Sequence, residues 1–230
     1  MEKLYKRFLA FIIVPVIIAA FPFLVFANTG AAAPYDWYFK PTKDNSQPEC
    51  IPEAEFIDEF NTVYLGSADT PTLYLTFDAG FDNGYHEKIL DTLKEKNVKA
   101  AFFVDGNFVK KNPELIKRMD AEGHLVCNHS LNHPDMTKYT SFADYEKQIK
   151  GWEELITQLG LTPSKYFRFP SGRFSKQALE YNEQLRLTTV FWSFAYYDWE
   201  ANNQPSHEAA KEKIYSRVHN GAVLLLHSTS

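Results

Sequence analysis

Two histidines, His129 and His133, stand four positions apart in the run His-Ser-Leu-Asn-His. One turn of helix-like backbone at this spacing would aim both imidazoles at a common point, as two ligands of one metal ion require. Taken alone, such a pair is explained equally well by two surface histidines. Its position after a strand-like run, beside other polar residues, favours a metal site.

A carboxylate and an arginine end two other apolar runs. Asp78 closes the run Leu73–Phe77, where a carboxylate is costly to bury unless a neighbouring group pairs with it. Arg168 is a natural partner, because its guanidinium would keep Asp78 ionised and oriented to take a proton from a metal-bound water. The alternative is a purely structural ion pair.

A third candidate, His227, ends the apolar run Val223–Leu226. A histidine there can donate a proton to a leaving amine if an acidic neighbour keeps it charged. Asp198, between Tyr197 and Trp199, is the candidate neighbour. Considered alone, His227 is more often a hydrogen-bonded core histidine.

The elements that must position these side chains alternate between strands and helices from residue 70 onward. Hydrophobic periodicity and capping residues predict strands over 72–77, 99–104, 124–127, 166–169, 188–193 and 222–227, and helices over 85–96, 112–122, 141–159, 175–184 and 206–218. This alternation predicts an α/β protein with a parallel sheet, open or closed into a barrel. All the candidate residues then fall at the carboxyl ends of strands, where active sites of such folds lie.

The N-terminal part of the chain has a different character. Residues 1–27 begin with lysines and an arginine and continue with an apolar run, the layout of a secretory signal peptide. We expect cleavage after Ala27 and export, with an uncleaved membrane anchor as the alternative. Residues 28–69 show no sustained period and predict an extended arm that buries its aromatic residues, such as Trp37 and Tyr38, on the catalytic domain at 70–230.

Composition narrows the choice of partners. The 230 residues carry a formal net charge of −5, and no basic cluster beyond the N-terminal segment is available to hold a nucleic acid. Cys50 and Cys127 are the only cysteines, so we expect free thiols and no disulfide framework. The length fits one catalytic domain, expected to be a monomer.

Taken in order, the motifs resemble those of the polysaccharide deacetylases of carbohydrate esterase family 4, over about residues 70–230. They are Thr76-Phe77-Asp78, His129-Ser130-Leu131-Asn132-His133, Arg168-Phe169-Pro170-Ser171-Gly172, Asp198-Trp199 and Leu225-Leu226-His227. Within the family, the chain is most similar to the delta-lactam-biosynthetic de-N-acetylases of spore-forming bacteria, which act on N-acetylmuramic acid of peptidoglycan. This closer likeness is carried by residues 76–84, 128–130, 190–193 and 198–199.

The resemblance implies a distorted (β/α) barrel, a divalent metal ion such as zinc or cobalt, and a role for each matching residue. Asp78 would be the general base, oriented by Arg168. His129 and His133 would be the metal ligands. His227 would be the general acid, tuned by Asp198. The same resemblance assigns the Ser171 backbone N–H to the oxyanion and Leu225 to the acetyl-methyl pocket.

The sequence departs from the family pattern in two places. Most members carry a second aspartate, the third protein ligand of the metal, where this chain has Ala79. The metal would then be weakly held unless water or Asp82 completes its shell. The sequence also stops at Ser230, where relatives continue, so the expected barrel lacks its last helix and strand.

The sequence therefore predicts an exported, metal-assisted hydrolase that deacetylates N-acetylmuramic acid of peptidoglycan, as in muramic delta-lactam formation in the spore cortex. An N-acetylglucosamine or chitooligosaccharide deacetylase would keep the chemistry and change the sugar. A non-catalytic wall-glycan-binding module, which Ala79 makes conceivable, would belong to another class. The expected partner is an N-acetylated glycan, with no nucleic acid and with a membrane only if the N-terminal segment is uncleaved.

Overall fold

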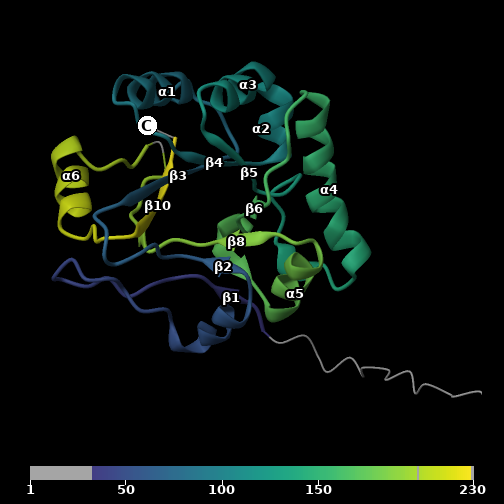
Figure 1. Ribbon diagram of the computed structural model, residues 1–230, viewed down its shortest axis with the longest axis horizontal. Coiled ribbons are helices and arrows are strands. Elements are labelled where there is room, and N and C mark those ends of the chain that lie inside the picture. Colours follow the sequence, from purple (N-terminus) through teal and green to yellow (C-terminus); the bar gives the residue numbers. More distant parts are fainter. Residues whose placement is uncertain (1–32, 201, 229–230) are drawn as a thin grey trace, which may run out of the picture. The chain divides into compact units, whose positions relative to one another are not determined.

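The computed structural model describes residues 33–200 and 202–228, all within the compact unit Ala31–Ser230 (Figure 1). The predicted signal peptide lies outside these residues. Within the described part of the chain, no helix combines the length and apolar character needed to cross a membrane.

An eight-stranded parallel sheet forms the centre of this unit. Its spatial order is β2 (Thr62–Val63), β8 (Thr188–Val190), β6 (Tyr166–Phe167), β5 (Leu125–Asn128), β4 (Ala101–Val104), β3 (Leu73–Ala79), β10 (Ala222–His227) and β9 (Phe194–Ala195). Every neighbouring pair is parallel. Among the described residues, the edge strands β2 and β9 are not paired with each other.

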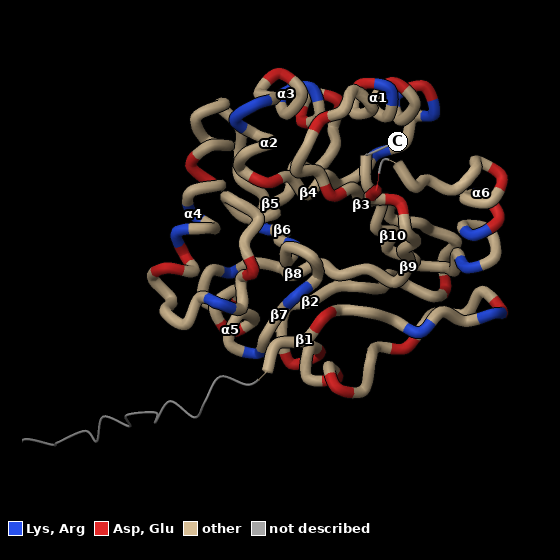
Figure 2. Tube along the Cα trace, turned by 180° about the vertical axis from the view of Figure 1, so that it is seen from behind, with Lys and Arg blue, Asp and Glu red and all other residues tan. Residues whose placement is uncertain are grey.

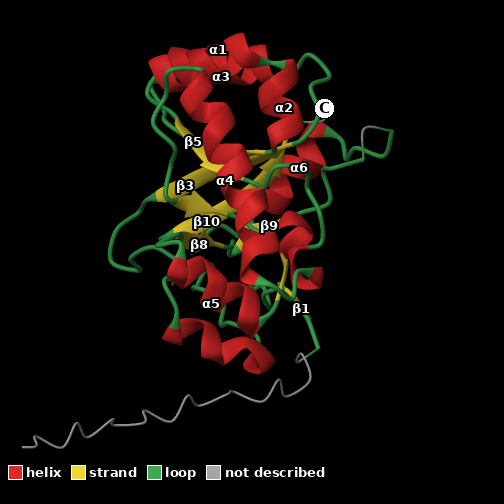
Figure 3. Ribbon diagram, turned by 90° about the vertical axis from the view of Figure 1, so that its right-hand side faces the viewer, coloured by secondary structure: helices red, strands yellow, loops and turns green. Residues whose placement is uncertain are grey.

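Helices lie around the outside of the curled sheet (Figures 1 and 3). They are α1 (His86–Glu95), α2 (Gly106–Lys111), α3 (Pro113–Ala121), α4 (Phe142–Gln158), α5 (Lys176–Gln184) and α6 (His207–Tyr215), with 3₁₀ turns η1 (Pro52–Glu59), η2 (Met136–Lys138) and η3 (Pro170–Gly172). Parallel strands need such crossovers, and the result is a half-barrel. The predicted (β/α) barrel class is confirmed.

Local sequence explains where several helices begin. The hydroxyl groups of Ser141, Ser175 and Ser206 each accept a hydrogen bond from the backbone N–H three residues later, which satisfies one free donor in the first turn. Helix α2 was not predicted, because its six residues are too few to show a helical period. Its first turn is capped by the carboxylate of Asp105.

The hydrophobic core occupies both faces of the sheet. In β4, Phe102 packs outward with the residues beneath α1–α4, including Trp152, whereas its neighbour Phe103 packs inward. The inward cluster is rich in aromatic residues and includes Phe169 and Phe191. Successive side chains of a strand face opposite ways, so β4 joins the two cores.

The N-terminal arm is more structured than the sequence predicted. Strand β1 (Tyr35–Asp36) pairs with β7 (Arg173–Phe174), η1 forms a helical segment, and β2 joins the main sheet. The prediction of a wholly extended arm was therefore wrong for η1; its mixed 3₁₀ geometry gives no 3.6-residue period. Trp37 is buried as predicted, but Tyr38 is 55% exposed.

Candidate active site

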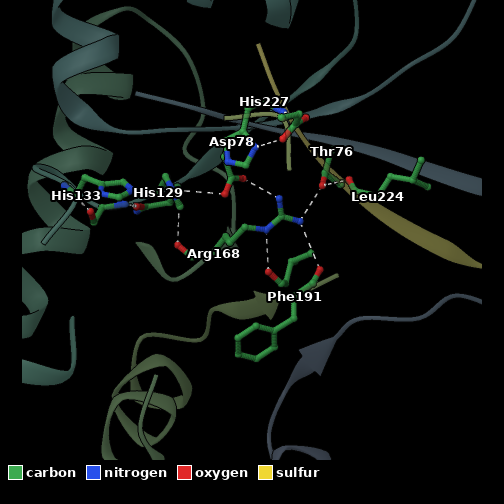
Figure 4. Close-up of polar contacts among 12 residues, drawn as sticks. Thr76, Asp78, His129, His133, Arg168, Phe191, Leu224 and His227 are labelled. Atoms are coloured by element: carbon green, nitrogen blue, oxygen red, sulfur yellow. Dashed lines mark hydrogen bonds and ion pairs between the residues drawn. The ribbon is translucent and has the colours of Figure 1, made fainter. Parts of the chain in front are cut away.

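The candidate residues lie together at the carboxyl-terminal rim of the sheet, as predicted (Figure 4). Asp78 is the penultimate residue of β3, and His129 and Arg168 directly follow β5 and β6. Asp198 follows β9, and His227 is the last residue of β10. The parallel register of β10 and β3 places His227 opposite Asp78. The hydrogen bonds between these two strands therefore fix the relative positions of the two residues.

These residues surround a cavity of about 770 Å³, a size typical of ligand sites. The predicted residues that line it are Asp78, His129, His133, Ser171, Leu225 and His227. Arg168 and Asp198 do not line the cavity; both are buried behind it. The cavity wall thus contains one carboxylate, Asp78, and three imidazoles, those of His129, His133 and His227, while Arg168 and Asp198 support Asp78 and His227 from behind.

The ion pair between Asp78 and Arg168 is present. A guanidinium nitrogen of Arg168 donates to Asp78 Oδ1 at 2.7 Å. Burial alone would raise the pKa of Asp78, but the positive charge of Arg168, with His129 and His227 nearby, outweighs burial and holds that pKa below its usual value. Asp78 is therefore an ionised carboxylate at neutral pH.

Arg168 itself is fixed by four hydrogen bonds and an aromatic contact. Besides Asp78, it donates to Thr76 Oγ1 at 2.8 Å and to the backbone oxygens of Val190 at 3.1 Å and Phe191 at 3.4 Å (Figure 4). Its guanidinium also lies 4.0 Å from the centre of the Phe103 ring. This planar set of donors suits arginine and not lysine.

His129 is held as a neutral imidazole. Its Nδ1 lies 3.0 Å from the backbone oxygen of Arg168, and because a carbonyl only accepts, Nδ1 carries the hydrogen. Burial lowers the pKa of His129 to about 4. Its Nε2, 3.6 Å from Asp78 Oδ2, is therefore the unprotonated nitrogen.

The two imidazoles meet edge to face, with ring centres 4.9 Å apart, but not by the predicted route. The backbone between them is no helical turn, because Ser130 has φ 70° and His133 has φ 53°, both in the left-handed region. The Ser130 hydroxyl accepts a hydrogen bond from the His133 N–H and stabilises this loop. The HxxxH spacing therefore predicted the contact but not its backbone conformation.

The donor chemistry fits a divalent metal ion held by two imidazoles. A backbone carbonyl that fixes the tautomer of His129 is the usual support for a histidine ligand. Among the described residues, no three His, Cys, Asp or Glu side chains are grouped to hold a metal ion. Asp82, a candidate for the third ligand, instead contacts His86 Nδ1 at 3.0 Å and is absent from the cavity wall.

His227 is bound to Asp198 at two points. The backbone N–H of His227 donates to Asp198 Oδ2 at 2.9 Å, and its Nδ1 lies 2.8 Å from Oδ1. Burial favours the neutral imidazole, but the hydrogen bond to Asp198 and the charge of Asp78 outweigh it, so the pKa of His227 is raised. Because Nδ1 is engaged, Nε2 is the nitrogen available to the cavity.

The turn η3 brings backbone to the cavity in an unusual conformation. Ser171 has φ 57° and ψ 13°, and Gly172 has φ 65°. A Cβ on Gly172 would lie 2.5 Å from the Trp192 ring, so glycine is required for both space and conformation. Such strain is common where a backbone group is presented to a substrate.

Asp105 was not among the predicted site residues. This buried carboxylate follows β4, caps α2 by accepting the Phe108 N–H at 2.7 Å, and lines the same cavity as His133. Burial raises its pKa. Asp105 directly follows strand β4, at the same rim as Asp78, and this position in the sequence could have indicated it as a site residue.

Comparisons with known proteins agree with this geometry. A family model described as polysaccharide deacetylase matches residues 66–190. The chain is 40% identical over 198 residues to the peptidoglycan-N-acetylmuramic acid deacetylase PdaA of Bacillus subtilis, covering 86% of this chain and 75% of that protein. It is 32% identical over 174 residues to a peptidoglycan-N-acetylglucosamine deacetylase of Bacillus cereus, covering 76% and 62%.

A solved structure of Bacillus subtilis PdaA, a family 4 carbohydrate esterase, superposes with a TM-score of 0.82 at 38% identity and covers 86% of this chain and 85% of that one. The sequence comparison and the structural comparison therefore indicate the same family over most of the chain. We conclude that it belongs to the polysaccharide deacetylase family and is a hydrolase of the family 4 carbohydrate esterases.

Proposed function

We propose that this chain removes the acetyl group from N-acetylmuramic acid of peptidoglycan, in the branch of wall chemistry that forms muramic delta-lactam in the spore cortex. One observation supports the catalytic part above all others: an ionised Asp78 and a raised-pKa His227 stand opposite each other on paired strands over one cavity. The likeness to a muramic acid deacetylase supports the choice of sugar.

Asp78 is the general base in this proposal. The Arg168 guanidinium fixes Asp78 Oδ1, and Oδ2 faces the His129 imidazole. A carboxylate held in this way accepts a proton from the water that attacks the amide carbonyl. Arg168 acts through Asp78, because it is completely buried and does not reach the cavity.

His227 is the general acid. Its raised pKa keeps the imidazolium populated near neutral pH, and Nε2–H donates to the amine that leaves the sugar. Asp198 holds the ring in orientation through Nδ1 and the backbone. The proton gained by Asp78 and the proton given by His227 balance the hydrolysis of one amide bond.

The oxyanion and the acetyl methyl group take the remaining roles. In this proposal the Ser171 backbone N–H, presented by the strained turn, stabilises the oxyanion. Leu225 offers the methyl group an apolar wall. A divalent ion such as zinc or cobalt, when bound by His129 and His133, would supply Lewis-acid polarisation of the carbonyl and of water.

N-acetylglucosamine is a second candidate sugar, because the Bacillus cereus relative is named as a deacetylase of that sugar. Assays on defined oligosaccharides distinguish the two sugars, because only muramic acid carries a lactyl ether.

We also propose that the protein is exported and acts on the wall after cleavage following Ala27. N-terminal sequencing of the secreted protein checks this, and a start at Met1 would contradict it.

Acetate release from peptidoglycan stripped of its muramic acid peptides tests the function directly. We expect release with added zinc or cobalt, loss with a chelator, and loss with Asp78→Asn, which keeps side-chain shape and removes the base. Retained activity in Asp78→Asn would overturn the base assignment. Wall-glycan binding by a folded chain without any acetate release would instead indicate a binding module.

A further inference from the structure

The N-terminal arm contacts the back of the active site. Strand β1 pairs with β7, directly after the oxyanion turn η3, and the two lie side by side in Figure 2. Trp37 follows β1 and is only 5% exposed. It lies outside the segment 66–190 matched by the family model, so the family pattern assigns it no role.

Trp37 is hydrogen-bonded to two segments of the site. Its backbone N–H donates to the Gly172 oxygen at 2.9 Å, which ties down the oxyanion turn. Its indole Nε1–H donates to the Trp192 oxygen at 2.9 Å, which ties down the segment after β8. One residue therefore links two segments that meet where the Trp192 ring fills the space beside Gly172.

The second segment also holds the residue that orients the base. The Trp37 indole stacks on Phe191 with ring centres 4.4 Å apart and an angle of 17°. The backbone oxygens of Val190 and Phe191 accept hydrogen bonds from Arg168, which in turn binds Asp78. A shift of residues 190–192 would therefore move the guanidinium, and with it the carboxylate.

We propose that Trp37 is a positioning residue of the active site, which holds the Ser171 N–H and the Arg168–Asp78 pair in their working geometry. Removing the indole donor leaves the buried Trp192 oxygen without its partner and frees both segments to shift. A displacement of a catalytic group by about 1 Å is enough to slow catalysis about a hundredfold. The kinetic part of this inference rests on the proposed deacetylase function; the structural part does not.

The test compares Trp37→Phe with Phe60→Leu. Trp37→Phe keeps an aromatic ring against Phe191 and deletes the Nε1–H donor. Phe60→Leu shrinks a partly buried aromatic of the same arm, whose ring contacts Phe56 and Lys176 and does not line the cavity. Both are assayed well below their melting midpoints, so that each chain is folded.

We expect Trp37→Phe to lower kcat on the order of tenfold with KM changed by less than about threefold, and Phe60→Leu to leave kcat unchanged. Amide hydrogen exchange gives a readout independent of activity. Exchange should quicken over 168–174 and 190–193 in Trp37→Phe alone. If Trp37→Phe does not fold, Trp37→Tyr takes its place in both measurements.

Wild-type kcat and wild-type exchange in the Trp37 variant would overturn the inference, as would an equal loss of kcat in Phe60→Leu. Failure of the proposed function looks different, because wild type itself would then release no acetate. In that case the exchange comparison still decides whether Trp37 holds the two segments.

Discussion

At the scale of single residues, the site contains two ionisable groups, Asp78 and His227, each supported by a buried partner of opposite charge. Asp78 is kept ionised by a buried guanidinium, whereas the hydrogen bond to Asp198 and the charge of Asp78 raise the pKa of His227. Both groups are partly buried, and burial alone would drive each toward its neutral form. Their specific partners outweigh that tendency, so the pKa of Asp78 is lowered and the pKa of His227 is raised, which is the separation that the proposed base and acid require.

Removing the charge of Asp198 should therefore move the pH profile. In Asp198→Asn, burial is opposed by less negative charge, so the pKa of His227 falls. The acid works only when protonated, so the alkaline limb of kcat/KM should move to lower pH. Acetate release measured from pH 5 to 10 at saturating metal shows the shift.

Asp82→Asn is the control, because Asp82 also contacts a histidine Nδ1, that of His86 at 3.0 Å, and does not line the cavity. Its alkaline limb should coincide with that of wild type. A limb that stays in place in Asp198→Asn would mean that His227 is not the titrating acid.

Residue types and their strand-end positions predicted most of this site. A carboxylate, an arginine and histidines that each end an apolar run must meet at one edge of a parallel sheet. The loop conformation of His133 and the burial of Asp105 could not be predicted, since both depend on contacts between distant segments. Asp82 shows the opposite error: it stands near Asp78 in sequence, but its carboxylate turns to His86.

At the scale of elements, the segments that precede β3 and β10 contact each other at two glycines, Gly66 and Gly221. The Gly66 N–H donates to the Gly221 oxygen at 2.7 Å, and the Gly221 N–H donates to the Thr72 oxygen at 2.9 Å. A Cβ on Gly221 would lie 2.5 Å from the backbone of Gly66. This contact sets where both strands begin, and hence which residues face each other at their other ends.

Gly221→Ala should therefore destabilise the fold well beyond the usual cost of a left-handed alanine. That cost is about 1–2 kcal/mol, and overpacking against backbone adds about 1–3 kcal/mol. Gly160→Ala is the matched control, with φ 79° against 75° at Gly221 and nothing within 4 Å of the added Cβ. Urea unfolding measures both, and equal losses would show that the contact tolerates a side chain.

Elements with several turns or an unbroken apolar run were predicted within a few residues. The long helix α4 and strand β10 are examples, because periodicity accumulates with length. Strand β6 is shorter than predicted, since Phe169 and Pro170 already begin the turn η3. Two-residue strands such as β9 carry no periodic signal, so only the pairing in the folded sheet reveals them.

At the scale of the whole molecule, the chain has a net charge of −5, and acidic and basic residues are interspersed over its helices (Figure 2). A glycan with free muramic acid carboxylates is also anionic. Long-range attraction between the two is therefore not available, and recognition must come from short-range contacts inside the cavity.

Added salt should consequently lower KM for peptide-stripped peptidoglycan fragments. The screening length falls from about 30 Å at 0.01 M to about 8 Å at 0.15 M, which weakens the repulsion between like charges. The same fragments with their muramic acid carboxylates converted to amides serve as the uncharged control, with a KM that stays constant. A KM that rises with salt for the anionic fragments alone would indicate a cationic docking surface.

The class of the fold followed from the alternation of strands and helices, which leaves few topologies open. The part played by the N-terminal arm could not be predicted. The proposed role of Trp37 depends on its hydrogen bonds to Gly172 and Trp192. Both residues are more than 130 positions away, so no local sequence pattern indicates these contacts.

The ladder between β3 and β10 joins six consecutive residue pairs and ends at Asp78 and His227. The separation of acid and base is thus a property of the central sheet, which a protein gives up only when it melts as a whole. Warming should therefore raise turnover steadily up to the global melting transition, with no earlier inactivation through loosening of this pair. Loss of the pairing between Asp78 and His227 and loss of the fold should therefore occur at the same temperature.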